Sequence, residues 1–146
     1  MTSKDKNPVV VSNELKRGEV WGETDKAVRW NGAFAVYGGH GATASSVIVY
    51  EIEPGKRLGW HTDATEETQY IIAGTGKLYL EDGSVLPIAA GSVFVLPTPM
   101  RHDVEATGNE TLRAVAFFAA AMFTQDFDQV MMPPMSHIIG TPNREG

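Results

Sequence analysis

Apolar and polar residues alternate over short stretches of this chain, and glycine or proline separates one stretch from the next. Alternation with a period of two is typical of β-strands that bury one face. The dipeptide Asp82-Gly83, set between two such stretches, indicates a tight hairpin. We therefore expect strands in these ranges: 9–11, 20–21, 27–37, 46–53, 67–73, 76–80, 84–88, 91–96 and 112–123.

Three segments are less regular. Residues 13–17 are compatible with a single helical turn, and residues 125–135 with a helical start that Pro133-Pro134 must end. Residues 140–146 read as coil. Many short strands at regular spacing indicate an all-β antiparallel sandwich or barrel. We expect one domain over residues 1–146, with extra strands at the N-terminal end and a short irregular C-terminal tail.

Composition narrows the chemistry. The chain has 146 residues, 12 basic against 18 acidic residues and a net charge of −6, which is the wrong sign for a nucleic-acid partner. Its longest apolar run, residues 114–123, is about half the ~20 residues needed to span a bilayer. The first residues lack the apolar core of a secretory signal, so we expect a cytoplasmic protein without a membrane partner. With no cysteine, the chemistry must come from His, Asp, Glu, Tyr or a metal.

One group of side chains combines imidazoles and carboxylates. In an extended segment, His61 and Asp63 would share a face, because residues i and i+2 of a strand point the same way. Glu67 opens the next strand, and Glu66 takes its place if the register slips by one. His102 follows a later strand and a proline corner. Such donors suit one divalent metal ion, Fe(II), Mn(II), Ni(II) or Zn(II).

The spacing of these residues resembles the two motifs of the cupin superfamily. In the first motif, G-x5-H-x-H-x3,4-E-x6-G, the histidine and glutamate positions are His61 and Glu67, and Asp63 replaces the second histidine. In the second motif, G-x5-P-x-G-x2-H-x3-N, His102 is the histidine. The remaining motif positions are matched at Gly55, Gly74, Gly91 and Pro97, and differ at Pro99 and Ala106.

The resemblance implies a small double-stranded β-helix (jelly-roll) barrel, with its core at about residues 45–120 and often assembled as a homodimer. It also implies one metal ion per chain, held by His61, Glu67 and His102, with Asp63 at the fourth ligand position. His61, Asp63 and His102 together have the makeup of a facial triad, which favours Fe(II). Alternatively, the aspartate is too short to reach the metal, and the site is weak or empty.

The first functional hypothesis is a metal-dependent enzyme that acts on a small molecule by dioxygenation, or by enolate-type isomerase, lyase or decarboxylase chemistry. Glu67 would be a fourth ligand or a general base, and Gln69 would orient substrate. A non-catalytic binding or sensor cupin is the alternative. Two weaker alternatives are a metal-free enzyme that uses His61 or His102 as acid or base, and a 2-oxoglutarate oxygenase that uses Arg113.

Several aromatic residues are candidates for other roles. Tyr50, Tyr79, Phe94 and Phe117 are candidates for the cavity lining, and Trp60 for a shield at its mouth. Trp21 and Trp30 read as exposed, so we expect a dimer interface near them.

Overall fold

The chain is a β-protein. The computed structural model describes residues 9 and 11–142, and within this part the chain forms twelve strands and no α-helix. The strands are β1 (Gly18–Gly22), β2 (Arg29–Val36), β3 (Ser46–Ile52), β4 (His61–Asp63), β5 (Glu67–Ala73), β6 (Thr75–Leu80), β7 (Val85–Ala89), β8 (Val93–Leu96), β9 (His102–Thr107), β10 (Leu112–Phe118), β11 (Thr124–Met132) and β12 (Ser136–Gly140). The predicted all-β class is confirmed.

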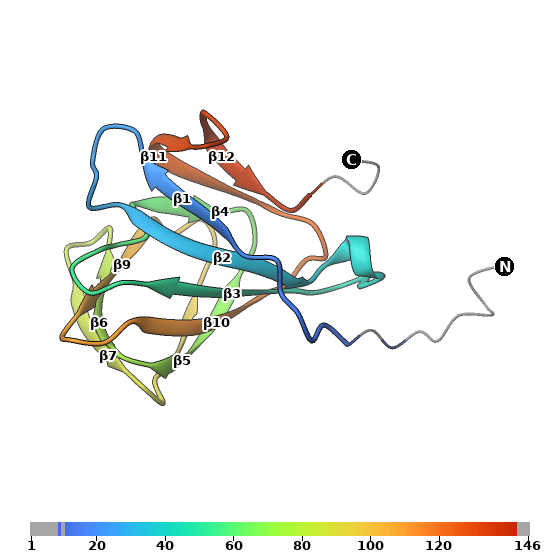
Figure 1. Ribbon diagram of the computed structural model, residues 1–146, viewed down its shortest axis with the longest axis horizontal. Coiled ribbons are helices and arrows are strands. Elements are labelled where there is room, and N and C mark those ends of the chain that lie inside the picture. The colour runs from blue at the N-terminus through green and yellow to red at the C-terminus, as the bar shows by residue number, and fades with distance from the viewer. Residues whose placement is uncertain (1–8, 10, 143–146) are drawn as a thin grey trace, which may run out of the picture.

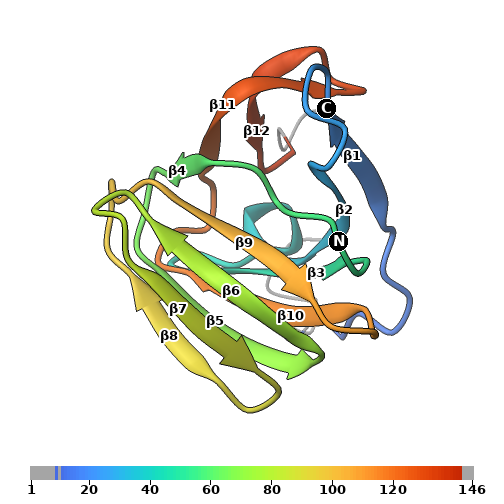
Figure 2. The same ribbon diagram turned by 90° about the vertical axis from the view of Figure 1, so that its left-hand side faces the viewer.

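All the strands belong to one curled sheet. Its hydrogen-bonded order is β7-β6-β9-β4-β11-β1-β2-β3-β10-β5-β8, and β12 pairs with β11. The named strands pair antiparallel throughout this order. Figures 1 and 2 show the sheet wrapping around a common interior, with β4, β9 and β11 on one side and β3 and β10 on the other. This is the double-stranded β-helix barrel that the motifs predict.

The interior is apolar but has room for polar side chains. Every second residue of β10 is buried, and two of these residues are the small Ala114 and Ala116. Ala116 lies opposite Ile48 of β3 on one side and Gln69 of β5 on the other. A methyl group on this central strand leaves space for the larger side chains of its neighbours.

The C-terminal part of the chain differs from expectation. Residues 124–132 form strand β11 instead of a helical start, because Gln125 and Phe127 point into the barrel while Asp126 and Asp128 are exposed. Residues 136–140 add strand β12 to the sheet, whereas residues 141–142 of the predicted coil lie outside the strands.

Smaller differences lie elsewhere. Residues 13–17 form no helical turn, and Val9 and Val11 lie outside the strands. Residue 10 of the predicted first strand and residues 143–146 of the predicted coil are outside the described residues. Strand β10 ends at Phe118 instead of residue 123. No helix in the described part of the chain has the length and apolar character needed to cross a membrane.

Candidate metal centre

Three neighbouring segments bring the predicted site residues together inside the barrel. Strand β4 carries His61 and Asp63, Glu67 begins β5, and His102 begins β9. His61 and His102 lie directly opposite each other on paired strands. All four side chains are buried, whereas Glu66 is exposed, so the register places Glu67 inside.

The donor atoms of these residues face one point. His102 Nε2 lies 3.4 Å from Asp63 Oδ2 and 3.5 Å from Glu67 Oε1, and His61 Nε2 lies 3.8 Å from Asp63 Oδ2. One ligand atom from each of His61, Asp63 and His102 lies within 4.8 Å of the other two. Atoms that share one metal at about 2.1 Å are about 3–4 Å apart, so this spacing suits a common ion.

Backbone carbonyls orient both imidazole rings. His61 Nδ1 lies 2.7 Å from the carbonyl oxygen of Gly59, and His102 Nδ1 lies 3.0 Å from that of Met100. A carbonyl oxygen can only accept, so Nδ1 carries the proton in both rings. In the neutral imidazole, Nε2 then presents a lone pair toward the carboxylates, as a metal ligand does.

Two glutamine side chains orient the carboxylates. Gln125 Nε2 donates to Asp63 Oδ1 at 2.9 Å, and Gln69 Nε2 donates to Glu67 Oε2 at 2.9 Å. The hydroxyl of Tyr50 donates in turn to the amide oxygen of Gln69. Each carboxylate therefore has one oxygen fixed by an amide and turns the other oxygen toward the histidines.

The oxygens and nitrogen that face inward have no partner among the described residues. Asp63 Oδ2, Glu67 Oε1 and His102 Nε2 are buried and accept no hydrogen bond. Acceptors that are this close repel one another unless a cation or a proton lies between them. Two imidazoles and carboxylate oxygens are donors that divalent transition metals accept, so the residues present fit such an ion.

The protonation of these groups reflects their burial. Burial, followed by the neighbouring His102, lowers the pKa of His61 to about 4, so this ring is neutral at pH 7. Burial, followed by the charge of Glu67, raises the pKa of Asp63 to about 7. Burial also raises the pKa of Glu67 to about 7. Without a cation, the two carboxyl groups therefore hold protons up to near-neutral pH.

A cavity adjoins the donor cluster. It has a volume of about 20 Å³ and reaches His61, Glu67, Tyr50 and Gln125. The rest of its wall is apolar and consists of Trp30, Ile48, Leu58, Ala116, Phe118 and Phe127. A space of this size holds about one water molecule beside the four donors.

Sequence reasoning missed three residues of this site. Gln125 and Phe127 were hidden by the helical interpretation of their segment, although their strict alternation with Asp126 and Asp128 is a strand signal. Trp30 was expected at the surface, but it is buried, lines the cavity and donates from its indole N–H to the carbonyl of Leu58 at 3.0 Å.

Of the four aromatic residues proposed for the lining, Tyr50 alone lines this cavity. Phe117 is exposed, Phe94 packs against the core, and Tyr79 bonds to Glu105 at 2.6 Å. Trp60 does not line the cavity and packs under the guanidinium group of Arg101.

Two further candidates lie away from the cavity wall. Gln69 is buried behind Glu67 and makes its hydrogen bonds to Glu67 and Tyr50. Arg113 is exposed and pairs with Glu51 at 3.0 Å on the outer side of the sheet. The position of Arg113 contradicts the 2-oxoglutarate hypothesis, because a carboxylate inside the barrel cannot reach it.

The comparisons with known proteins agree with this architecture. The sequence model of the cupin domain matches residues 48–118, which contain all four donors. A 3-hydroxyanthranilate 3,4-dioxygenase from Jannaschia sp. (strain CCS1) is 42% identical over 53 residues, which are 34% of this chain and 29% of that enzyme. The chain therefore matches less than a third of the length of that relative.

Solved structures share the fold at low identity. The oxalate decarboxylase of Lactobacillus farciminis superposes with a TM-score of 0.67 and 22% identity over 80% of this chain and 34% of that chain. The polyketide cyclase RemF from Streptomyces resistomycificus superposes with a TM-score of 0.56 and 18% identity over 61% of this chain and 63% of that chain. These structures share the fold, and the match to the cupin-domain model together with the two motifs identifies the chain as a small member of the cupin superfamily.

Proposed function

We propose that this cupin is an enzyme that holds one divalent metal ion and acts on a small oxygenated molecule inside the barrel, with dioxygenation as the favoured reaction. The observation that carries the proposal is the group of buried atoms Asp63 Oδ2, Glu67 Oε1 and His102 Nε2, which face one another and have no hydrogen-bond partner among the described residues. A divalent cation would take the place of the protons that the two carboxyl groups otherwise hold.

His61, His102 and Asp63 would hold the metal. Two imidazoles and one carboxylate are the ligands of the Fe(II) facial triad, so Fe(II) is the favoured ion, although Mn(II), Ni(II) and Zn(II) accept the same donors. When bound, such an ion supplies Lewis acidity toward substrate oxygens and, in the case of iron, electrons for dioxygen chemistry.

Glu67 has a different role from Asp63. Its Oε1 lies beside His102 and also lines the cavity, so it can be a fourth ligand or can take a proton from a bound molecule. A carboxylate whose pKa is raised to about 7 by burial is suited to proton transfer at neutral pH. Gln69 and Tyr50 act as positioning residues, because they hold the other oxygen of this carboxylate.

The local similarity to a 3-hydroxyanthranilate 3,4-dioxygenase supports dioxygenation. A second candidate is enolate-type isomerase, lyase or decarboxylase chemistry, which the position and raised pKa of Glu67 favour. The two differ in their need for oxygen. Oxygen uptake with catechols, diketones or keto acids is expected in the first case, and turnover of the same compounds without oxygen in the second.

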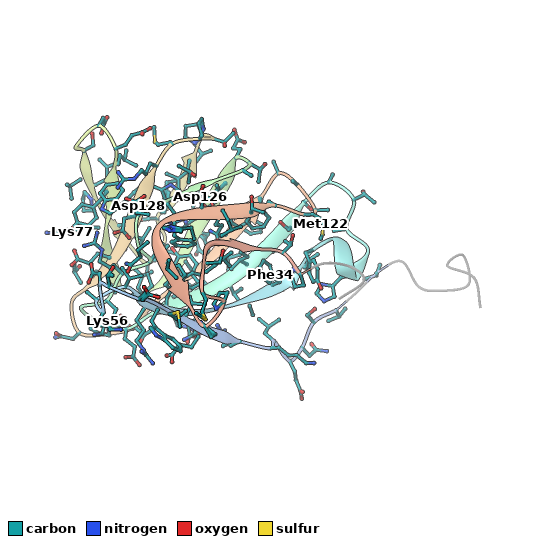
Figure 3. All side chains as sticks on the ribbon, turned by 90° about the horizontal axis from the view of Figure 1, so that it is seen from above. Phe34, Lys56, Lys77, Met122, Asp126 and Asp128 are labelled. Carbon is teal, nitrogen blue, oxygen red and sulfur yellow. The ribbon has the colours of Figure 1, made fainter. Side chains whose placement is uncertain are left out.

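The first test is the metal content of the protein purified without added metal. We expect close to one transition-metal ion per chain, and less than a tenth of that in Asp63→Asn. The matched control is Asp126→Asn, an exposed aspartate of β11 that points away from the barrel (Figure 3). Wild-type protein that binds no transition metal, even when metal is supplied, would contradict the proposal.

Metal binding without any catalysis would favour a different function. Stoichiometric metal together with tight binding, but no turnover, of these compounds would favour the non-catalytic binding or sensor cupin. The homodimer, the cytoplasmic location and the lack of a nucleic-acid partner stay predictions.

A further inference from the structure

A second, larger chamber adjoins the cavity of the metal centre. It has a volume of about 240 Å³ and shares Trp30, Ile48 and Gln125 with the inner cavity. These shared residues form the boundary between the two spaces. Gln125 also donates a hydrogen bond to Asp63, so one side chain of the chamber wall contacts a proposed metal ligand directly.

Missing side chains create much of this space. Gly18 of β1 and Gly32 of β2 lie directly opposite each other on paired strands, and both line the chamber. A Cβ atom at Gly18 would meet no atom within 4 Å. A Cβ at Gly32 would lie 3.0 Å from the ring of Trp30, so a side chain there would press on the shared wall. A pair of glycines thus keeps the chamber open next to the inner cavity.

The chamber differs chemically from the inner cavity. Apart from Gln125 and Lys16, the described side chains of its wall are apolar: Val20, Trp30, Ala33, Phe34, Ile48 and Ile139. Phe34, at the rim, lies toward the same end of the molecule as Met122 and away from Lys77 (Figure 3). An apolar group that moves from water into such a chamber gains free energy with every methylene it buries.

We propose that the outer chamber is a binding subsite for the apolar part of the substrate, and that Gly18 and Gly32 determine its size. The substrate class is then an amphipathic small molecule, with an oxygen-bearing chelating group at one end and an aliphatic chain or ring at the other. The chelating end of this molecule is inferred from the proposed function. Its apolar end is inferred from the chamber alone. Trp30, Ile48 and Gln125 line both spaces, so the two ends of the molecule would meet at these side chains.

Two hydroxamates that differ only in their alkyl group test the subsite on metal-loaded protein. Isothermal titration calorimetry should give a dissociation constant for hexanohydroxamate at least tenfold lower than for acetohydroxamate, or about 1.4 kcal/mol. The longer compound should also show a more negative heat-capacity change, because it buries apolar surface.

Gly18→Leu fills the chamber without touching the donors. It should remove the gain of the longer hydroxamate and leave the affinity for acetohydroxamate within about twofold of wild type. The control Ala89→Leu adds the same side chain at an exposed position of β7, outside the chamber wall, and should keep the gain. If Gly18→Leu does not fold, Ile139→Trp fills the chamber from β12. An equal affinity of wild type for both hydroxamates would overturn the proposal.

Metal-free protein supplies a test that does not depend on the ion. Cyclohexanol should shift the methyl resonances of Val20 and Ile139 in wild type and in Ala89→Leu, but not in Gly18→Leu. No shift in wild type would overturn the subsite. Cyclohexanol binding without any hydroxamate binding would support the subsite while contradicting the proposed metal function.

Discussion

The buried carboxylate of Asp103 accepts a hydrogen bond of 2.9 Å from the backbone N–H of Gly59. The carbonyl of Gly59 in turn accepts the Nδ1 proton of His61 at 2.7 Å. Asp103 directly follows the proposed ligand His102 in sequence. It therefore fixes the backbone segment that orients the second proposed histidine ligand, His61. Arg57 compensates the charge of Asp103 through a hydrogen bond of 2.7 Å from its Nε.

Asp103→Asn tests this relationship. The substitution removes the charge that pairs with Arg57 and disturbs the contact with Gly59, so we expect a loss of about 1–3 kcal/mol in the free energy of unfolding. Metal affinity should fall by about 10–100-fold, because His61 loses part of its orientation. Urea unfolding and a metal titration measure the two effects. An unchanged metal affinity in a destabilised protein would show that Asp103 serves the fold alone.

Gly59→Ala is expected to disturb the same segment through the backbone. Gly59 has a φ of +98°, and an added Cβ would lie 3.0 Å from Cγ1 of Val28. We expect a cost of about 1–3 kcal/mol and weaker metal binding. The matched control is Gly83→Ala, at a φ of +91° in a hairpin with no atom near the new Cβ. It should lose stability through backbone strain but keep the metal affinity of wild type.

The raised pKa of Glu67 predicts a pH-dependent stability of the metal-free protein. Between the usual pKa of 4.5 and about 7, the folded chain keeps a proton that the unfolded chain has lost, so stability falls as the pH rises. The raised pKa of Asp63 likewise makes stability fall as the pH rises toward about 7. His61, with its pKa lowered to about 4, acts in the opposite sense between about pH 4 and 6.5.

Glu67→Gln isolates the carboxyl contribution. In the presence of a chelator, the Tm of this variant relative to wild type should be higher at about pH 8 than at about pH 5, because glutamine carries no charge to bury. Added Mn(II) should stabilise wild type most at the higher pH, where the carboxylates are free to bind it. A Tm difference that is the same at both pH values would contradict the raised pKa.

Arg113→Gln tests the exclusion of 2-oxoglutarate chemistry. The exposed pair of Arg113 and Glu51 on the outer side of the sheet should contribute less than about 1 kcal/mol to stability. The variant should bind metal and substrate as wild type does, and wild type should form no succinate from 2-oxoglutarate. Succinate formation that depends on Arg113 would show that this arginine reaches the site.

Most of the strand ranges and the four candidate donors follow from local pattern and motif spacing, whereas strands β4, β9, β11 and β12 were not among the expected ranges. The order of residues within 46–53 and 67–73 tells which residues share a face, because neighbouring residues of a strand point to opposite sides. It does not tell which face is buried, since Glu67 is buried and Ile72 is exposed. The sequence left Glu66 as the alternative to Glu67, and the strand register decided that Glu67 lies inside. Fixed spacings between glycine turns and the donors carry the cupin resemblance, so these features could be predicted before any contact between strands was known.

Which strands become neighbours was decided only by the tertiary structure. Gln125 reaches Asp63, 62 residues away in sequence, because β11 pairs with β4, and the opposed Gly18 and Gly32 open a chamber only because Trp30, Ile48 and Ile139 close around them. Local spacing indicates which residues share a face of a strand, but not which residues lie opposite them across the barrel. The acceptors that need a cation, and the chamber beside them, arise from contacts between distant strands, and those contacts exist only once the sheet has closed on itself.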